Sequence, residues 1–171
     1  MREIKFRGKA IMSIEELELM GIEHDNGWVY GNLIKNGNRP IISSDIVEEI
    51  DESIYPEWWV VVEPESVGQY TGMKDKNGTP IYEGDIVTGE SFETSMLNHW
   101  KAGLLKHLDY EVEYVPEMYV IKYHEASFKT FNSKGNWVAV LNHHVSSEVK
   151  DLQVIGNVFE NPGLLEVEKN E

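Results

Sequence analysis

The sequence predicts an α+β protein that is predominantly β, with a small SH3-like or related β-barrel in its C-terminal half. An N-terminal region of strands and hairpins is expected before the barrel, together with one or two short helices. Short β-branched and aromatic runs separated by regular turn signals predict the strands, whereas helices are indicated only by a capping box before 14–20 and by apolar spacing at 92–108. The 171 residues suit one domain or one domain with a small appendage. We divide them into residues 1–66, a barrel-like region at 67–165 and a fraying tail at 166–171, with one domain over the whole chain as the alternative.

The N-terminal region opens with two predicted elements of different kinds. Residues 4–10 alternate basic residues with apolar residues, glycine and alanine, which is the period of two expected for a strand with one buried face. A short helix is expected at 14–20, because Ser13 and Glu16 are spaced as a capping box. The strand would therefore present its positive charges on one side.

A hairpin and a buried strand are expected next. Residues 28–34 and 40–43 are rich in aromatic and β-branched residues and flank an Asn-Gly pair, which favours a hairpin turn. Residues 44–57 are acidic and weakly patterned. The run at 58–62 predicts a buried strand.

The rest of the chain combines turn chemistry with strand and helix patterns. Residues 66–79 contain three glycines and predict an ordered loop that leads into a tight turn. Residues 81–87 look like a strand interrupted by a bend at Gly84, and the apolar spacing at 92–108 predicts one amphipathic helix. Further strands are expected at 110–115, at 118–131 with a break near Ala126, at 137–141 and at 154–159.

The charge of the chain restricts its partners. Thirty Asp and Glu residues against fifteen Lys and Arg residues give a formal charge of -15, which opposes binding to phosphate backbones. Nucleic acid is therefore an unlikely partner on electrostatic grounds. Residues 10–66 hold thirteen of these acids against Lys35 and Arg39. This excess favours a solvated surface, and the alternative is an acidic face that competes for a basic partner, as a mimic of DNA would.

The sequence also leads to an expectation about cellular location. No run approaches the roughly 20 apolar residues that a membrane helix needs, and the charged first residues do not resemble a secretory signal. We therefore expect the cytoplasm of the cell that makes the protein, and no membrane contact. The chain has no cysteine, so neither disulfides nor cysteine-ligated metals contribute to its fold.

Signatures of catalysis and metal binding are sparse. The chain has no Walker lysine loop and no G-x-G-x-x-G, G-x-S-x-G or H-E-x-x-H motif, so we expect no cofactor and no metal. The histidines are interpreted as surface residues. A site that joins His124 to His143 or His144 across a sheet is the alternative.

Three further groups of residues each allow a functional and a structural interpretation. Asp75 followed by Asn77 resembles a fragment of a calcium loop, but a plain turn is favoured because the remaining ligands are missing. Glu83 and Asp85 could divide acid and base roles, yet the bend at Gly84 favours an Asp85 that caps nearby amides. Five aromatic residues would either line a ligand cleft or form the core: Trp58, Trp59, Tyr70, Tyr82 and Trp137.

Three stretches of the chain resemble one known family. Residues 66–87, SVGQYTGMKDKNGTPIYEGDIV, are similar to the central block of the YopX family, whose members are small proteins encoded by bacteriophages and prophages. The opening MREIKFRGK with WVYG at 28–31 resembles the start of the family, and VIGNVFENPGLL at 154–165 resembles its end. Residues 89–112, which include the predicted amphipathic helix, look longer than the family's usual link.

The resemblance implies a β-rich α+β fold, phage origin and action inside the infected host, and it supplies no catalytic residue. The matching positions have residue types that suit the backbone, because glycine allows positive φ and Asp stabilises turns. These signature positions are Gly68, Gln69, Tyr70, Thr71, Gly72, Asp75, Gly78, Tyr82, Gly84 and Asp85.

Together these features favour a non-enzymatic accessory protein that binds a host or phage protein. Self-association is a natural extension, because unpaired strand edges and exposed aromatic residues favour it. Two alternatives stay open. One is a small-molecule or oligonucleotide binder that uses a barrel face near Tyr70 and Tyr82. The other is an enzyme that uses Glu83 or Asp85.

Overall fold

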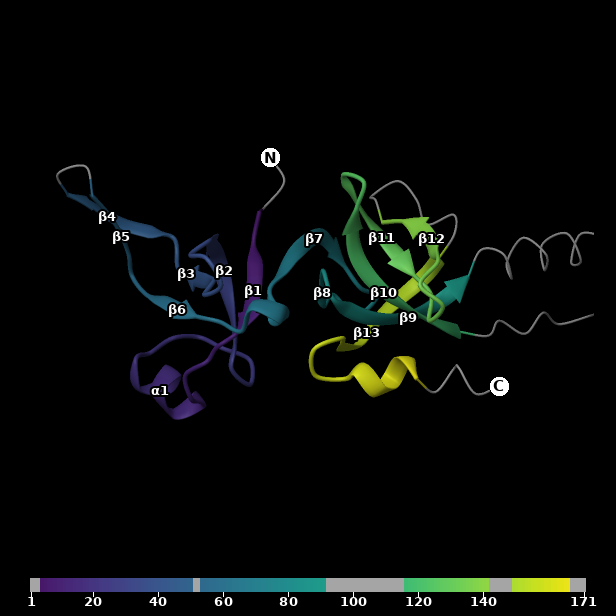
Figure 1. The fold of residues 1–171 in the computed structure, drawn as a ribbon, viewed down its shortest axis with the longest axis horizontal. Coiled ribbons are helices and arrows are strands. Elements are labelled where there is room, and N and C mark those ends of the chain that lie inside the picture. Colours follow the sequence, from purple (N-terminus) through teal and green to yellow (C-terminus); the bar gives the residue numbers. More distant parts are fainter. Residues whose placement is uncertain (1–3, 51–52, 92–115, 142–148, 167–171) are drawn as a thin grey trace, which may run out of the picture. The chain divides into compact units, whose positions relative to one another are not determined.

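The computed structural model describes residues 4–50, 53–91, 116–141 and 149–166, and its contacts divide the chain into two units (Figure 1). We call Met1–Gly72 the N-terminal unit and Met73–Glu171 the C-terminal unit. The domain boundary predicted between residues 66 and 67 stays a prediction. Within the described residues, no helix combines the length and the apolar character that crossing a membrane requires.

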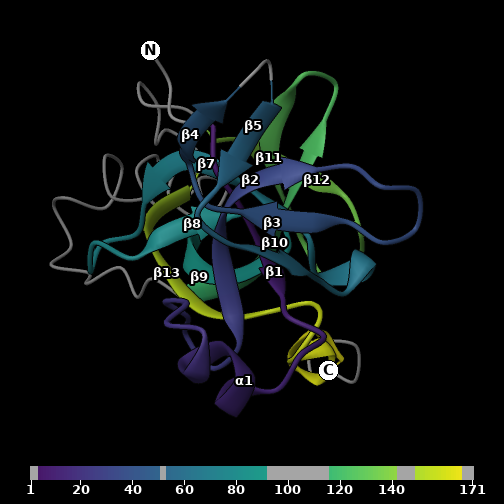
Figure 2. The ribbon, with the colours of Figure 1, turned by 90° about the vertical axis from the view of Figure 1, so that its left-hand side faces the viewer.

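The N-terminal unit is built on an antiparallel sheet with the strand order β6-β3-β2-β1-β7, and Figure 2 shows β2 and β3 side by side in it. β7 continues into the C-terminal unit, where β8 (Pro80–Tyr82) is its neighbour. A separate hairpin joins β4 (Ile46–Ile50) to β5 (Ser53–Pro56). The sheet strands are β1 (Phe6–Lys9), β2 (Trp28–Ile34), β3 (Ile41–Ser43), β6 (Trp59–Val61) and β7 (Gly68–Lys74). The predicted N-terminal strand, the hairpin and the buried strand at 58–62 are confirmed in position, with shorter ends.

Helix α1 (Ile14–Leu19) begins at the capping box that the sequence predicts. The amide of Glu16 donates to Ser13 Oγ at 3.2 Å, and the amide of Ser13 donates to Glu16 Oε2 at 2.8 Å. Only one residue of the helix, Leu17, is buried, and it anchors α1 in the core of the unit. A short 3-10 helix, η1 (Pro64–Ser66), precedes β7. The buried core residues are Leu17, Ile22, Val29, Ile42, Val60 and Val62.

The C-terminal unit contains a five-stranded antiparallel sheet in the order β12-β11-β10-β9-β13. β12 and β13 are its two edges, so the described strands form an open sheet. Closure into a barrel requires the edge strands to pair, and the expected SH3-like barrel is therefore not confirmed in the described part of the chain. The elements of this unit are β9 (Asp85–Ser91), β10 (Pro116–His124), β11 (Ser127–Phe131), β12 (Trp137–Val140), β13 (Val149–Asn157) and the 3-10 helix η2 (Pro162–Leu165).

The break predicted near Ala126 is the turn between β10 and β11. Glu125 has a φ of 48° and Ala126 a φ of 62°, and two consecutive positive φ values are typical of the tight turns that match the twist of paired strands. The strands on either side of this turn contribute side chains to the core of the unit. This core consists of Ile81, Val87, Tyr119, Ile121 and Phe128.

One sequence expectation about local structure was wrong. Residues 66–79 were expected to form a loop, but β7 occupies much of this segment, and Gly68 pairs with Arg7 of β1. Gly72 in this strand adopts a φ of 85°, which residues with a Cβ reach only with strain, so the backbone favours glycine at this position. The weak pattern at 44–57 also gave no sign of the β4–β5 hairpin. The predicted helix at 92–108 and strand at 110–115 lie outside the described residues.

Candidate functional site

Asp75 follows β7 and directs both of its carboxylate oxygens at backbone amides. Oδ1 accepts hydrogen bonds from Asn77 at 2.8 Å and from Thr79 at 2.9 Å, and Oδ2 accepts one from Val154 at 3.1 Å. Burial acts to raise the pKa of Asp75, but the hydrogen bonds from Thr79, Val154 and Asn77 outweigh it and lower the pKa below its ordinary value. This geometry is that of the predicted turn, with an additional tie to β13.

Glu83 and Asp85 accept hydrogen bonds from amides of two different strands. Asp85 is only 1% exposed, and its Oδ2 accepts the amide hydrogen of Tyr82 at 2.7 Å. Glu83 Oε1 accepts the amide hydrogen of Tyr123 at 3.1 Å. Gly84 bends the chain between them with a φ of 83°. A substrate would reach Asp85 only if the core opened, so the geometry does not favour an acid and base pair here.

The oligonucleotide alternative depends on exposed tyrosine rings and on the basic strand β1. Tyr82 is 5% exposed, so its ring offers no face to a stacking base. Arg7 is 9% exposed, and its guanidinium carbon lies 4.8 Å from the centre of the Trp28 ring. Lys9 Nζ lies 5.7 Å from the same centre and donates to the backbone oxygen of Asn26 at 2.7 Å. These cations therefore contact groups of their own unit, which does not favour binding of a phosphate backbone.

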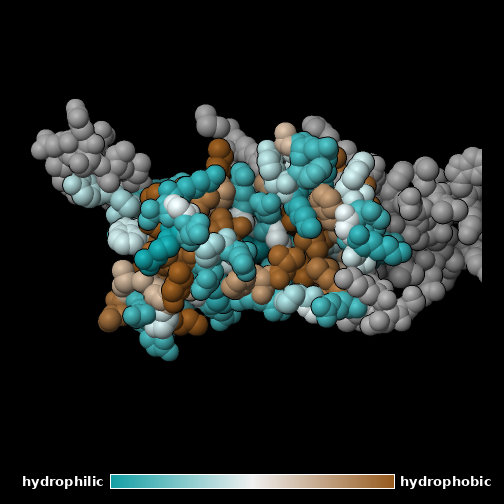
Figure 3. Space-filling view, viewed as in Figure 1, coloured by the Kyte–Doolittle hydropathy of each residue, from teal (hydrophilic) through white to brown (hydrophobic). Residues whose placement is uncertain are grey.

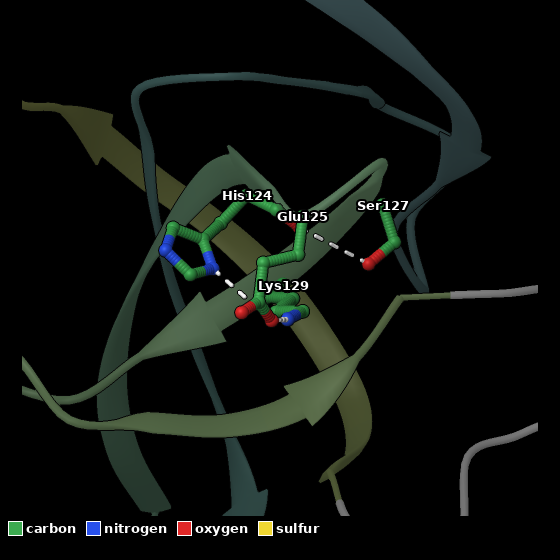
Figure 4. Close-up of polar contacts among 4 residues, drawn as sticks. All are labelled: His124, Glu125, Ser127 and Lys129. Carbon is green, nitrogen blue, oxygen red and sulfur yellow. Dashed lines mark hydrogen bonds and ion pairs between the residues drawn. The ribbon is translucent and has the colours of Figure 1, made fainter.

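A second polar cluster surrounds the β10–β11 turn (Figure 4). Lys129 is 7% exposed, and its Nζ donates to Glu125 Oε2 at 2.6 Å and lies 5.5 Å from the centre of the Trp137 ring. Nδ1 of His124 lies 3.5 Å from the same oxygen, which makes an ion pair when the imidazole is protonated. The hydrogen bond from Lys129, followed by the charges of Lys129 and His124, lowers the pKa of Glu125. The cluster thus stabilises its own hairpin.

Two residues considered as metal-binding partners of His124 cannot be placed beside it. His143 and His144 lie outside the described residues. His124 lies beside Glu125, its backbone oxygen accepts a hydrogen bond from Ser127 Oγ at 3.3 Å, and the centre of the Phe131 ring lies 6.0 Å from its own. A shared metal site across the sheet stays a prediction.

The N-terminal unit contains a hollow of about 610 Å³, which we call the α1–β6 hollow. Three of its large apolar side chains are more than half exposed: Ile11 at 53%, Met20 at 56% and Trp59 at 57%. Figure 3 shows hydrophobic surface over the part of this unit that holds α1. Trp58 and Val61 continue the apolar lining. Exposed apolar side chains gathered in one place are characteristic of interaction sites.

The hollow exists because of the path that the chain takes beside β6. Residues before the helix run along the outer edge of β6, where Ala10 pairs with Val62 and the amide of Ile11 donates to the backbone oxygen of Val61 at 3.1 Å. Ser13 then caps α1 and turns the chain into the helix. The remainder of the β6 edge, at Trp59, is left beside the hollow.

The rim of the hollow is negative. Glu16 and Glu57 are exposed on it, against the single exposed cation Arg39 among its lining residues. The first turn of α1 carries Glu15 as well as Glu16, and its last turn carries no basic residue. The arrangement can therefore combine apolar contacts with attraction for a positive charge.

Sequence reasoning identified only part of this site. Trp58 and Trp59 belonged to the five aromatic residues that would line a cleft or form the core, and the structure puts both in the hollow. Tyr82 of the same set is in the core, whereas Trp137 is 58% exposed on β12. Ile11 and Met20 were missed. The exposure of Leu19 and Met20 at the end of α1 follows from the helix having one buried residue, which its sequence alone does not determine.

Fold and site together define a predominantly β protein with two compact units. The family model described as YopX protein matches residues 6–166, and the chain therefore belongs to the YopX family. Among curated proteins, none matches the chain. Among solved structures, the crystal structure of protein EF1440 from Enterococcus faecalis is similar, with a TM-score of 0.48 and 20% identity over 96% of this chain and 99% of that chain.

Proposed function

We propose that this YopX protein is a non-enzymatic binding module that contacts a host or phage protein through the α1–β6 hollow. The observation that carries the proposal is the gathering of Ile11, Met20 and Trp59, each more than half exposed, in one hollow. Tryptophan is among the residues that dominate protein interfaces, and methionine adapts its shape to a partner. A protein surface supplies the apolar groups that would cover these side chains.

Charge supports a protein as the partner over a nucleic acid. The chain carries a formal charge of -15, and the rim of the hollow adds Glu16 and Glu57 at the place of contact. A phosphate backbone would be repelled there. The resemblance to a phage-encoded family supports a partner that is present in infected bacteria.

The positions of three carboxylates within residues 66–87 support a binding role over a catalytic one. Asp75, Glu83 and Asp85 each accept hydrogen bonds from backbone amides, so they are engaged in shaping the chain. The hollow itself brings together no nucleophile and base among its described lining residues. The lining of the hollow therefore suits binding of a partner and not catalysis.

The test is affinity capture with the tagged full chain, compared with two variants of matched exposure. Trp59→Ala removes an aromatic side chain from the hollow, and Trp137→Ala removes one of nearly equal exposure, 58% against 57%, from β12. We expect a captured protein to be lost with Trp59→Ala and kept with Trp137→Ala, because truncation of an interface tryptophan costs about 2 kcal/mol or more, or roughly thirtyfold in affinity.

Capture from uninfected and from phage-infected bacteria separates a host partner from a phage partner. Thermal unfolding of both variants checks that each is folded. If the two variants and the natural chain capture the same proteins in the same amounts, the proposal is wrong.

A further inference from the structure

We infer that the α1–β6 hollow takes an extended, basic peptide segment, which adds to the edge of β6 at Trp59 and places apolar side chains in the hollow. This inference rests on the proposed function and specifies the partner of the same site. Three features carry it: an open strand edge, an apolar hollow beside that edge, and a negative rim.

The open edge follows from the hydrogen-bond register of β6. Val60 pairs with Ile42 of β3, and the neighbouring bonds to β3 run from Ser44 N to Trp58 O at 3.0 Å and from Val62 N to Pro40 O at 3.0 Å. Alternate residues of an antiparallel strand direct their peptide groups to opposite edges. The peptide groups of Trp59 and Val61 therefore point away from β3.

Only one of these two residues has its outer side covered by the chain. The amide of Ile11 donates to Val61 O at 3.1 Å, and beyond this point Ser13 starts α1. Within the residues that the structure describes, no backbone group bonds to the outer N–H and C=O of Trp59. A strand edge of this kind is the template to which an extended peptide adds.

The hollow lies where the side chains of an added strand would project. Successive side chains of a strand point to opposite faces, so every second side chain of the added segment would enter the hollow. Ile11, Met20 and the ring of Trp59 would then cover them. The main chain of the segment supplies affinity, and its alternate apolar side chains supply selectivity.

The charges around the hollow select the remaining side chains of the segment. Glu16 and Glu57 on the rim favour Lys or Arg in the segment, and Arg39 is the one opposing cation among the described lining residues. The wider stretch at 10–66 carries thirteen acids against two basic residues. A second copy of this chain would bring the same negative charge and is therefore a poor occupant. A helix would cover the hollow without pairing with Trp59.

The inference is tested by selecting from a library of short random peptides with the natural full chain as bait and with Trp59→Ala as counter-selection. We expect the enriched peptides to alternate apolar residues with Lys or Arg. Methylation of the peptide nitrogen that pairs with Trp59 should weaken binding about fivefold, because it removes one backbone hydrogen bond. The variant Glu57→Lys should weaken the same peptides by about two- to fivefold.

Several outcomes would overturn the inference. They are the absence of any peptide that prefers the natural chain to Trp59→Ala, enrichment of acidic peptides, enrichment of peptides with helical apolar spacing, and insensitivity of an enriched peptide to methylation at every backbone nitrogen. Trp137→Ala must bind the enriched peptides as the natural chain does. If a protein is captured only when Trp59 is present but the peptide selection fails, the proposed function is retained. The inference that the partner contributes an extended peptide segment is then rejected.

Discussion

The signature block at residues 66–87 and the α1–β6 hollow differ in how accessible their carboxylates are. Asp75 and Asp85 of the block are 8% and 1% exposed and accept hydrogen bonds from backbone amides. Glu16 and Glu57 at the hollow are exposed to solvent, and Glu16 Oε2 also accepts the amide hydrogen of Ser13 in the capping box. Asp75 and Asp85 thus shape the chain, whereas the exposed Glu57 at the hollow ends the weakly patterned stretch at 44–57. Substitutions in the two regions should therefore separate stability from binding.

The largest effect is expected for Asp75→Ala. This substitution leaves the amides of Asn77, Thr79 and Val154 without their carboxylate acceptor, and we expect the free energy of unfolding to fall by about 3 kcal/mol. Denaturant unfolding measures the change. Peptide binding at the α1–β6 hollow, measured while the variant is folded, should stay at the level of the natural chain. Weakened binding with unchanged stability would reverse the roles we assign to the two regions.

The next effect concerns binding. Trp59→Ala should weaken an enriched peptide by about thirtyfold, or about 2 kcal/mol, while the free energy of unfolding changes by less than about 1 kcal/mol because the side chain is 57% exposed. Fluorescence anisotropy of a labelled peptide and denaturant unfolding give the two numbers. Trp137→Ala is the control of matched exposure and should leave peptide binding unchanged, although it removes the ring beside Lys129 and should lower the free energy of unfolding by about 1 kcal/mol. A large loss of stability in Trp59→Ala would mean that the ring packs in the core of the unit instead of being available to a partner.

A smaller effect is expected at the start of α1. Ser13→Ala removes the acceptor for the amide of Glu16 and should destabilise this short helix by about 1 kcal/mol. Faster amide hydrogen exchange within Ile14–Leu19 would report the change, and peptide binding should weaken because α1 carries Glu16 to the rim. Ser13→Asp keeps a capping oxygen and should retain the natural behaviour. Equal exchange in all three proteins would show that α1 does not depend on its cap.

The smallest effect is a change in how stability depends on pH. The pKa of Asp75 is lower in the folded chain than its ordinary value, so its ionised form stabilises the fold above about pH 3.9 and this contribution is lost as the pH falls through the folded pKa. Asp75→Asn should therefore show a shallower loss of unfolding free energy in acid. Trp137→Ala, which leaves every carboxylate in place, should keep the natural slope. An unchanged slope in Asp75→Asn would contradict the role of this carboxylate.

Elements that depend on nearby residues could be predicted from the sequence. The capping box of Ser13 and Glu16, the hairpin over 28–34 and 40–43, and the turn at Ala126 are set by the chemistry of a few adjacent positions. The role of Asp75 in its turn was predictable for the same reason. The hydrogen bond that it accepts from the amide of Val154 could not be predicted, because Val154 lies far along the chain.

Features that depend on distant segments escaped prediction. β7 looked like a loop because Gly68 and Gly72 favour turns, and its pairing with β1 and β8 makes it a strand. Closure of a barrel is likewise decided by which edge strands meet, which no local pattern contains. The α1–β6 hollow arises where the chain leaves the edge of β6 after Ile11, so its lining residues share no motif.

The hydrogen bond from Val154 to Asp75 has a consequence for synthesis of the protein on the ribosome. The N-terminal unit has its paired strands β1, β2, β3 and β6 once residue 72 has been made, apart from the end of β7. The sheet of the C-terminal unit must wait for β13, because β9 lies between β10 and β13. Nascent chains that stop before Val149 would leave the β9 edge that pairs with β13 unpaired. Asp75 Oδ2 would also lack the hydrogen bond from the amide of Val154. The first unit can therefore mature during translation, while the second matures only when nearly all of the chain has emerged.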